Sequence, residues 1–245
     1  MNPFAPIRSG LLAAALLGAA VGGALAADPA CHAASGARRA DVVELYTSEG
    51  CSSCPPADHW LSGLKGRDDV VALAFHVDYW DNLGWKDRFA SPAYTARQAE
   101  WRARLKARFV YTPQVIVDGA DTRDLPAAAA PRVDLALDRE GDAVRARVTP
   151  RPGAPARLAA YWAVTENGHA TAVKAGENGG ATLHHDFVVR EYVPVAAWSS
   201  APGVAATLAL RPTTRPDPGH PRRIDLVVFD PETGRPLQAL ALACD

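Results

Sequence analysis

The sequence lacks a net charge, because 26 Lys and Arg residues oppose 27 Asp and Glu residues and leave a formal charge of −1 at pH 7. A chain balanced in this way has no overall field that attracts nucleic acid or an anionic membrane, so we expect no nucleic-acid partner. Beyond residue 27 the chain also lacks an apolar stretch of the roughly 20 residues that a membrane span needs. Its hydrophobic content of 48% is enough for ordinary cores in one large domain or two small ones.

Familiar catalytic and metal-binding patterns are also missing. No Ser-His-Asp arrangement, phosphate-binding loop or paired-carboxylate signature stands out. The Cys-x-x-Cys at Cys51 and Cys54 has no second such pair and no His-x-x-x-His beside it, which argues against a closed structural zinc site. Adjacent His184 and His185 would point to opposite faces of a strand, so we expect hydrogen-bonding or surface roles for them. The sequence therefore predicts no bound metal and no organic cofactor.

The N-terminal segment has the layout of a secretory signal peptide. Arg8 precedes an apolar run over residues 10–25, and small residues follow at 24–27. A membrane anchor is the alternative, but the run is rich in Ala and Gly and shorter than a span requires. We expect residues 1–27 to be a signal peptide, no membrane span after its cleavage, and a periplasmic or secreted protein.

The four cysteines of an exported chain are expected to meet an oxidising compartment. Cys51 and Cys54 are close together, whereas Cys31 and Cys244 bracket nearly all of the remaining chain. The simplest pairing is one local disulfide and one terminal disulfide. The alternative leaves Cys31 and Cys244 as unpaired thiols near the ends.

Two regions differ in their hydrophobic rhythm. The first alternates strands with helices, and the apolar run at 70–77 is typical of a strand covered on both faces in a parallel sheet. Its expected elements are a strand at 42–47, a helix starting near Ser53 with Pro55 and Pro56 in its first turn, and, after 70–77, a helix at 91–108 and a strand at 114–117. From about residue 131 the period becomes two, with Pro- and Gly-rich turns, which predicts an antiparallel β region. We therefore predict domains at 40–130 and 131–245.

A Cys-x-x-Cys at the start of a helix is suited to redox chemistry. The first cysteine faces the unsatisfied N–H groups and the positive end of the helix dipole, which favours its reactive thiolate. Cys51 would then attack a substrate and Cys54 would resolve the mixed disulfide. A structural disulfide or a metal site has the same spacing and stays open as an alternative.

Three segments resemble a family of exported bacterial proteins catalogued as domain of unknown function 1223. They are Val-Glu-Leu-Tyr-Thr-Ser-Glu-Gly-Cys-Ser-Ser-Cys-Pro-Pro-Ala-Asp, His-Val-Asp-Tyr-Trp-Asp-Asn-Leu-Gly-Trp-Lys-Asp and Tyr-Thr-Pro-Gln-Val-Ile-Val-Asp-Gly, all within residues 41–119, with weaker similarity from Gly176-Glu177-Asn178 to Glu191. The resemblance implies an α/β thioredoxin-like domain. The antiparallel β region would follow it as a small antiparallel β-sandwich-like domain. It implies no substrate.

In thioredoxin-like proteins the position of Pro113 is a cis-proline beside the Cys-x-x-Cys loop. The resemblance thus implies that Pro113 shapes a substrate groove and that the Thr112 backbone bonds an extended substrate. The alternative is an ordinary trans proline that opens an edge strand.

His76 and Asp78 stand at the end of the second predicted strand, on the side of the sheet where ligands bind. Either could act as an acid/base for Cys54, or His76 could be a satisfied core residue and Asp78 a loop cap. A copper(I) site formed by Cys51, Cys54 and His76 is a further alternative.

The sequence therefore predicts thiol–disulfide exchange on the thiols or disulfides of exported proteins. The rival interpretation is a non-catalytic binding module in which Cys51 and Cys54 form a fixed disulfide.

Overall fold

The computed structural model describes Met1, residues 31–127 and residues 129–244. These residues form fourteen strands, two α-helices and one 3-10 helix. The elements are β1 (His32–Ala34), β2 (Asp41–Thr47), α1 (Pro55–Ser62), β3 (Val70–His76), η1 (Asp81–Leu83), α2 (Pro92–Arg104), β4 (Gln114–Val117), β5 (Ala120–Asp121), β6 (Val133–Glu140), β7 (Ala143–Pro150), β8 (Arg157–Glu166), β9 (His169–Ala172), β10 (Thr182–His185), β11 (Val188–Ser199), β12 (Ala206–Leu210), β13 (Arg222–Phe229) and β14 (Pro236–Leu242).

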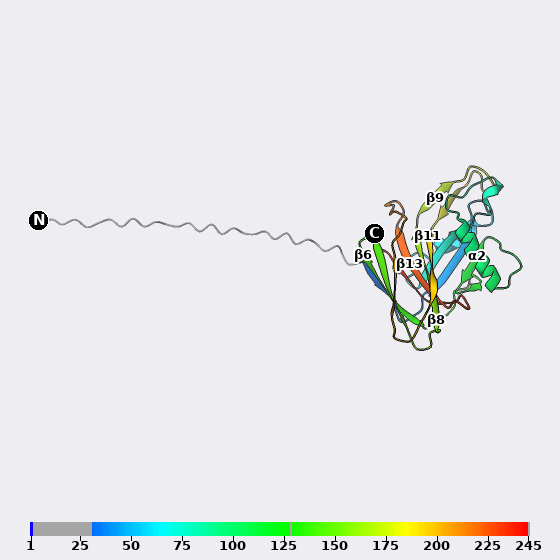
Figure 1. Ribbon diagram of the computed structural model, residues 1–245. Helices are drawn as coiled ribbons and strands as arrows, with labels where there is room; N and C mark the ends of the chain where they lie inside the picture. The colour runs from blue at the N-terminus through cyan, green and yellow to red at the C-terminus, as the bar shows by residue number, and fades with distance from the viewer. Residues whose placement is uncertain (2–30, 128, 245) are drawn as a thin grey trace.

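Most of the strands belong to two sheets. The larger has eight strands in the order β14-β13-β8-β11-β3-β2-β4-β5, and the smaller has four in the order β1-β6-β7-β12. β2 and β3 pair in parallel along their whole length, which confirms the parallel pairing predicted for this region. The two α-helices begin and end within a few residues of the predicted ones. Figure 1 shows β6 at one end of the molecule and α2 at the other.

The predicted fold class, an α/β thioredoxin-like domain followed by a small antiparallel β-sandwich-like domain, is wrong. The described chain is mostly β, with helices of only 8 and 13 residues. After Gly119 the chain adds the two-residue β5 and then returns as strands that extend the same sheet. The physical reason lies in β8. Every residue of β8 after the first is buried, and this strand lies between β13 and β11 inside one large sheet instead of in a separate small sandwich. The domain boundary near residue 130 stays a prediction.

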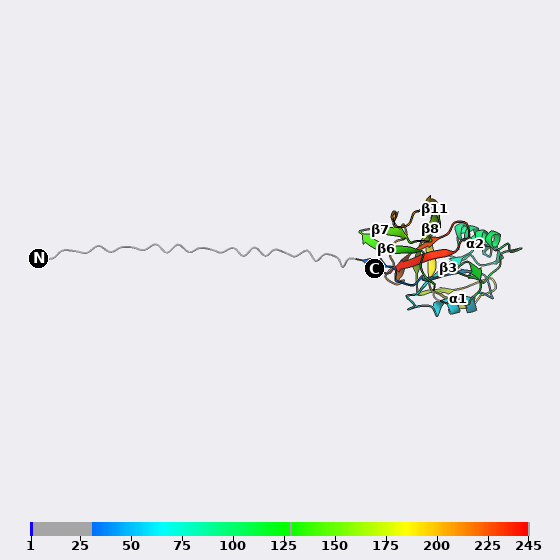
Figure 2. The same cartoon turned by 90° about the horizontal axis from the view of Figure 1, so that it is seen from below.

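Alternating side chains place three apolar clusters on the two faces of the large sheet. On one face, Val42 and Tyr46 of β2 pack with Tyr94 and Trp101 of α2. On the other face, Val43 and Leu45 pack with α1, and further along the sheet β8 and β13 pack against the four-stranded sheet. Figure 2 shows α1 and α2 on opposite sides of β3. The end of β2, where the cysteine loop begins, is therefore enclosed from both faces.

The ends of the described chain are tied together. Cys31 and Cys244 form a disulfide across a sequence separation of 213 residues, and β1 pairs with β6 beside it. This confirms the predicted terminal pairing. Within the described residues, no helix combines the length and the apolar character that crossing a membrane requires. The predicted signal peptide lies outside the described residues.

Candidate functional site

Cys51 and Cys54 form a disulfide in the loop between the end of β2 and the start of α1. Pro55 and Pro56 occupy the first positions of α1, as predicted, and proline has no N–H to offer. The next two N–H groups, of Ala57 and Asp58, donate to the Cys54 carbonyl oxygen at 2.8 and 3.2 Å. The start of α1 thus presents fewer free N–H groups to Cys51 than a helix start without prolines would.

The backbone around the disulfide is contacted by a loop that is distant in sequence, which we call the covering loop. Cys51 and Cys54 are both 0% exposed, although Ser52 and Ser53 between them are exposed. The covering loop, residues 173–181, connects β9 to β10. Asn178 Nδ2 donates to the carbonyl oxygens of Glu49 and Cys51 at 2.9 and 3.0 Å. Cys51, which a substrate must reach for the predicted exchange, is therefore not exposed in this conformation.

The same loop holds the backbone between the two cysteines. The Ser52 N–H donates to Glu177 Oε2 at 3.0 Å, and this contact is solvent-exposed. Hydrogen bonding from the side chain and the backbone of Ser52 lowers the pKa of Glu177. Only the family resemblance singles out Gly176-Glu177-Asn178 in the sequence, because nothing in the local sequence indicates which distant loop these residues contact.

Thr112 and Pro113 lie beside the cysteine loop. The Thr112–Pro113 peptide bond is cis, as the resemblance implied. Ser53 Oγ donates to the Thr112 carbonyl oxygen at 3.5 Å, and Trp80 Nε1 donates to Thr112 Oγ1 at 2.8 Å. The structure thus brings Thr112 next to Ser53, across 59 residues of sequence. A substrate groove at this position stays a prediction.

The two acid/base candidates have different surroundings. Asp78 accepts a hydrogen bond from Thr95 Oγ1 of α2 at 2.5 Å. His76 is 0% exposed, and its Nδ1 lies 2.6 Å from Asp87 Oδ2. Burial raises the pKa of Asp87, but His76 and two N–H donors outweigh burial and lower it to about 2. Asp87 is therefore ionised at neutral pH and orients the His76 ring.

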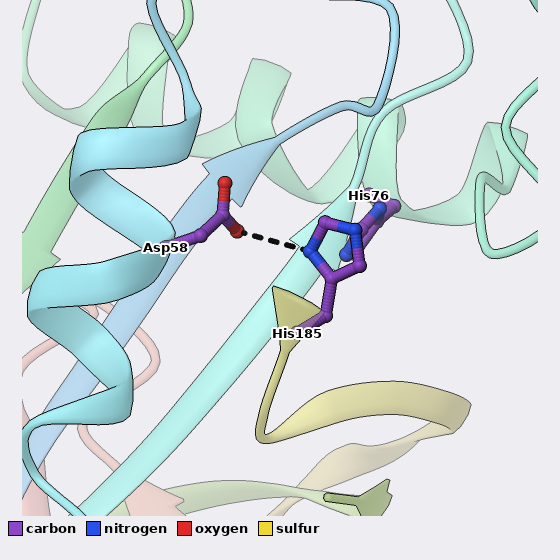
Figure 3. A group of neighbouring side chains, drawn as sticks. All are labelled: Asp58, His76 and His185. Carbon is purple, nitrogen blue, oxygen red and sulfur yellow. Dashed lines mark ion pairs between the residues drawn. The ribbon is translucent and has the colours of Figure 1, made fainter. Parts of the chain in front are cut away.

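A second group of polar side chains comes together from α1, β3 and β10. Ligand-forming atoms of Asp58 from α1, His76 from β3 and His185 from β10 all lie within 4.8 Å of one another (Figure 3). His185 Nδ1 lies 3.6 Å from Asp58 Oδ1, and its Nε2 lies 3.6 Å from Glu49 Oε1. Burial lowers the pKa of His185, but Asp58 and Glu49 outweigh burial and raise it to about 9. We call Asp58, His76 and His185 the buried triad.

The sequence pattern does not identify His185 as a site residue. Adjacent residues of a strand face opposite ways, as predicted, since His184 is exposed and His185 is 2% exposed. That the inward-facing His185 meets His76 of another strand depends on the tertiary fold, which no local pattern specifies. The copper(I) alternative with Cys51, Cys54 and His76 stays a prediction, although both cysteines are in a disulfide here.

Comparison with known proteins identifies the family. No curated protein matches this chain. The crystal structure of protein AGR_C_4864 from Agrobacterium tumefaciens is similar, with a TM-score of 0.63 and 26% sequence identity over 84% of this chain and 94% of that one. Residues 42–228 match the family described as "Protein of unknown function (DUF1223)". The chain therefore belongs to the DUF1223 family.

Proposed function

We propose that this protein carries out thiol–disulfide exchange on exported protein thiols or disulfides, in the periplasm or after secretion, and that the covering loop controls access to the Cys51–Cys54 disulfide. One observation carries the proposal. The Cys51–Cys54 disulfide lies in the loop that follows β2, and Asn178 and Glu177 of the covering loop contact the backbone of that loop through polar hydrogen bonds. Polar contacts of this kind exchange for water at low net cost when a loop opens.

The exchange needs no organic cofactor. A substrate thiolate attacks the Cys51 sulfur, the Cys51–Cys54 bond breaks, and Cys54 leaves as a thiolate that takes up a proton. A second substrate thiolate then attacks the substrate sulfur of the mixed disulfide and releases Cys51. The substrate dithiol loses two electrons and two protons, which the protein gains as its own dithiol. Run in reverse, the protein dithiol reduces a substrate disulfide.

Further predicted residues would assist this chemistry. Thr112 and Pro113 would contact an extended substrate beside Ser53, and His76 or Asp78 would serve as an acid/base for Cys54. These roles rest on the position of Thr112 next to the loop and on the position of His76 at the end of β3.

Catalysed reduction of a disulfide-bonded peptide by dithiothreitol tests the proposal. We expect the parent protein to accelerate the reaction, Cys51→Ser to abolish the acceleration, and Cys54→Ser to trap a mixed disulfide with the peptide, because the resolving thiol is missing. Equal rates with the parent and with Cys51→Ser would contradict exchange at this pair.

The full burial of both cysteines supports a second candidate function. In it, Cys51–Cys54 is a fixed disulfide that stabilises the loop of a non-catalytic binding module. The two candidates differ in one observable: a fixed disulfide stays closed in the native protein under mild reduction, and no mixed disulfide forms with Cys54→Ser.

A further inference from the structure

The buried triad contains side-chain nitrogens without hydrogen-bond partners. Among the described residues, His76 Nε2 is buried and makes no hydrogen bond, and the two buried ring nitrogens of His185 face Asp58 and Glu49 only at ion-pair distances of 3.6 Å, beyond hydrogen-bond length. Buried polar atoms are nearly always paired, and leaving one unpaired costs roughly 1–3 kcal/mol. Several such atoms that face one another indicate that something absent from this structure binds among them.

His76 is held in the form that a metal ligand needs. Asp87 Oδ2 lies 2.6 Å from His76 Nδ1, and Asp87 is itself fixed by the N–H groups of Glu49 and Phe89 at 2.9 and 2.8 Å. A carboxylate that accepts the Nδ1 proton leaves the lone pair of Nε2 pointing away, toward the other members of the triad. Carboxylate–histidine pairs of this kind typically support metal-bound histidines.

The charges around the triad favour a cation. Glu49, Asp58 and Asp87 are 0%, 6% and 2% exposed, and the ion pairs that they make are with the two histidines. A divalent cation would displace the proton from His185 and balance the same carboxylates in its place.

The spacing and the access also fit an ion. Two ligands of one tetrahedral zinc ion are about 3.4 Å apart, and Asp58 Oδ1 lies 3.6 Å from His185 Nδ1. A cavity of about 580 Å³ between α1 and β10 is lined by both Asp58 and His185. An ion could therefore enter through this cavity while the disulfide stays covered.

We propose that Asp58, His76 Nε2 and a ring nitrogen of His185 bind a divalent transition-metal ion of the zinc class. Two imidazoles and one carboxylate suit zinc or cobalt(II), whereas copper(I) prefers thiolates. Three protein ligands leave a fourth position open. A metal-bound His76 is not free to act as an acid/base, so the metal site and that predicted role exclude each other.

Metal titration of the oxidised protein tests this site independently of the exchange reaction. We expect the chelator-treated protein with both disulfides intact to bind one equivalent of Zn²⁺ in a calorimetric titration. His185→Gln should weaken binding at least 100-fold, whereas the matched control His184→Gln, an exposed neighbour on the same strand, should bind like the parent. No stoichiometric uptake by the parent, or equal losses with both variants, would overturn the proposal.

Two further measurements keep the test valid if a variant folds poorly. Co²⁺ added to the oxidised parent should give visible bands of a nitrogen- and oxygen-ligated ion without a sulfur-to-cobalt charge-transfer band. The Cys51→Ser/Cys54→Ser variant, which cannot exchange, should bind Zn²⁺ like the parent. Loss of binding in that variant, or a sulfur band, would place the ion on the cysteines and contradict the triad.

Discussion

Asp41 is a buried carboxylate with an incomplete set of partners. It is 6% exposed, and among the described residues its Oδ1 has no hydrogen-bond partner. The Arg39 guanidinium donates a hydrogen bond to Asp118 at 2.7 Å, whereas its Nη2 lies 3.6 Å from Asp41 Oδ1. Burial raises the pKa of Asp41, and the negative charge of Asp118 raises it further, to about 6. At neutral pH this residue therefore destabilises the fold.

The sign of the pH dependence follows from this pKa. In the unfolded chain an Asp has a pKa of about 3.9, so the folded state binds more protons between that value and about 6. The contribution of Asp41 to the free energy of unfolding thus falls as the pH rises through this window. We expect Asp41→Asn to raise that free energy by about 1 kcal/mol at pH 7.5, less than the full shift would give because Asn loses the ion pair with Arg39.

Urea unfolding at pH 4 and at pH 7.5 measures this effect. The gain should disappear at pH 4, where Asp41 is protonated in the folded protein. The exposed neighbour Asp68 provides the control, since Asp68→Asn should change stability little at either pH. A loss of stability at pH 7.5 in Asp41→Asn would show that the charged carboxylate is needed.

At the scale of elements, β9 and β10 carry the covering loop. They form a two-stranded sheet of their own, and among the described residues no strand pairing joins this sheet to either larger one. Lys65 in the segment after α1 makes an ion pair with Asp186, next to the end of β10, at 2.8 Å. The hairpin is therefore anchored near its base, and its far end rests on the cysteine loop through Asn178 and Glu177.

Removing the Asn178 side chain should open the cover. Asn178→Ala deletes both hydrogen bonds to the cysteine loop, so we expect reduction of Cys51–Cys54 by dithiothreitol to be several-fold faster in the native protein. Asn82→Ala, an exposed asparagine in η1, is the matched control and should react at the parent rate. Identical rates for Asn178→Ala and the parent would mean that this loop does not limit access.

At the scale of the whole molecule, one large sheet joins regions that the sequence analysis assigned to separate domains. β2, α1, β3, α2 and β4 could be predicted because their signals are local, such as an apolar run at 70–77, prolines after the second cysteine, and helical spacing after Pro92. The strands β8 and β11 were missed. Their place beside β3 depends on pairings such as Val188 with Ala74, which no local pattern specifies.

The residues of the candidate site likewise fall into those that the sequence can predict and those that it cannot. Cys51, Cys54 and Pro113 carry recognisable local motifs and were predicted. The buried triad is assembled from α1, β3 and β10, so its members come together only through the tertiary fold. The hydrogen bond from Asn178 to the Cys51 carbonyl oxygen could not be predicted for the same reason, because the two residues are 127 positions apart in sequence.

A redox titration of the intact protein tests the central claim most directly. The protein is equilibrated in glutathione buffers, alkylated without denaturant, and each cysteine is then quantified by peptide mass. We predict that Cys51–Cys54 opens reversibly in the folded protein while Cys31–Cys244 stays closed, since closing a loop of that length contributes about 5 kcal/mol. Opening of Cys51–Cys54 only together with Cys31–Cys244, when the protein unfolds, would contradict exchange and leave a fixed disulfide.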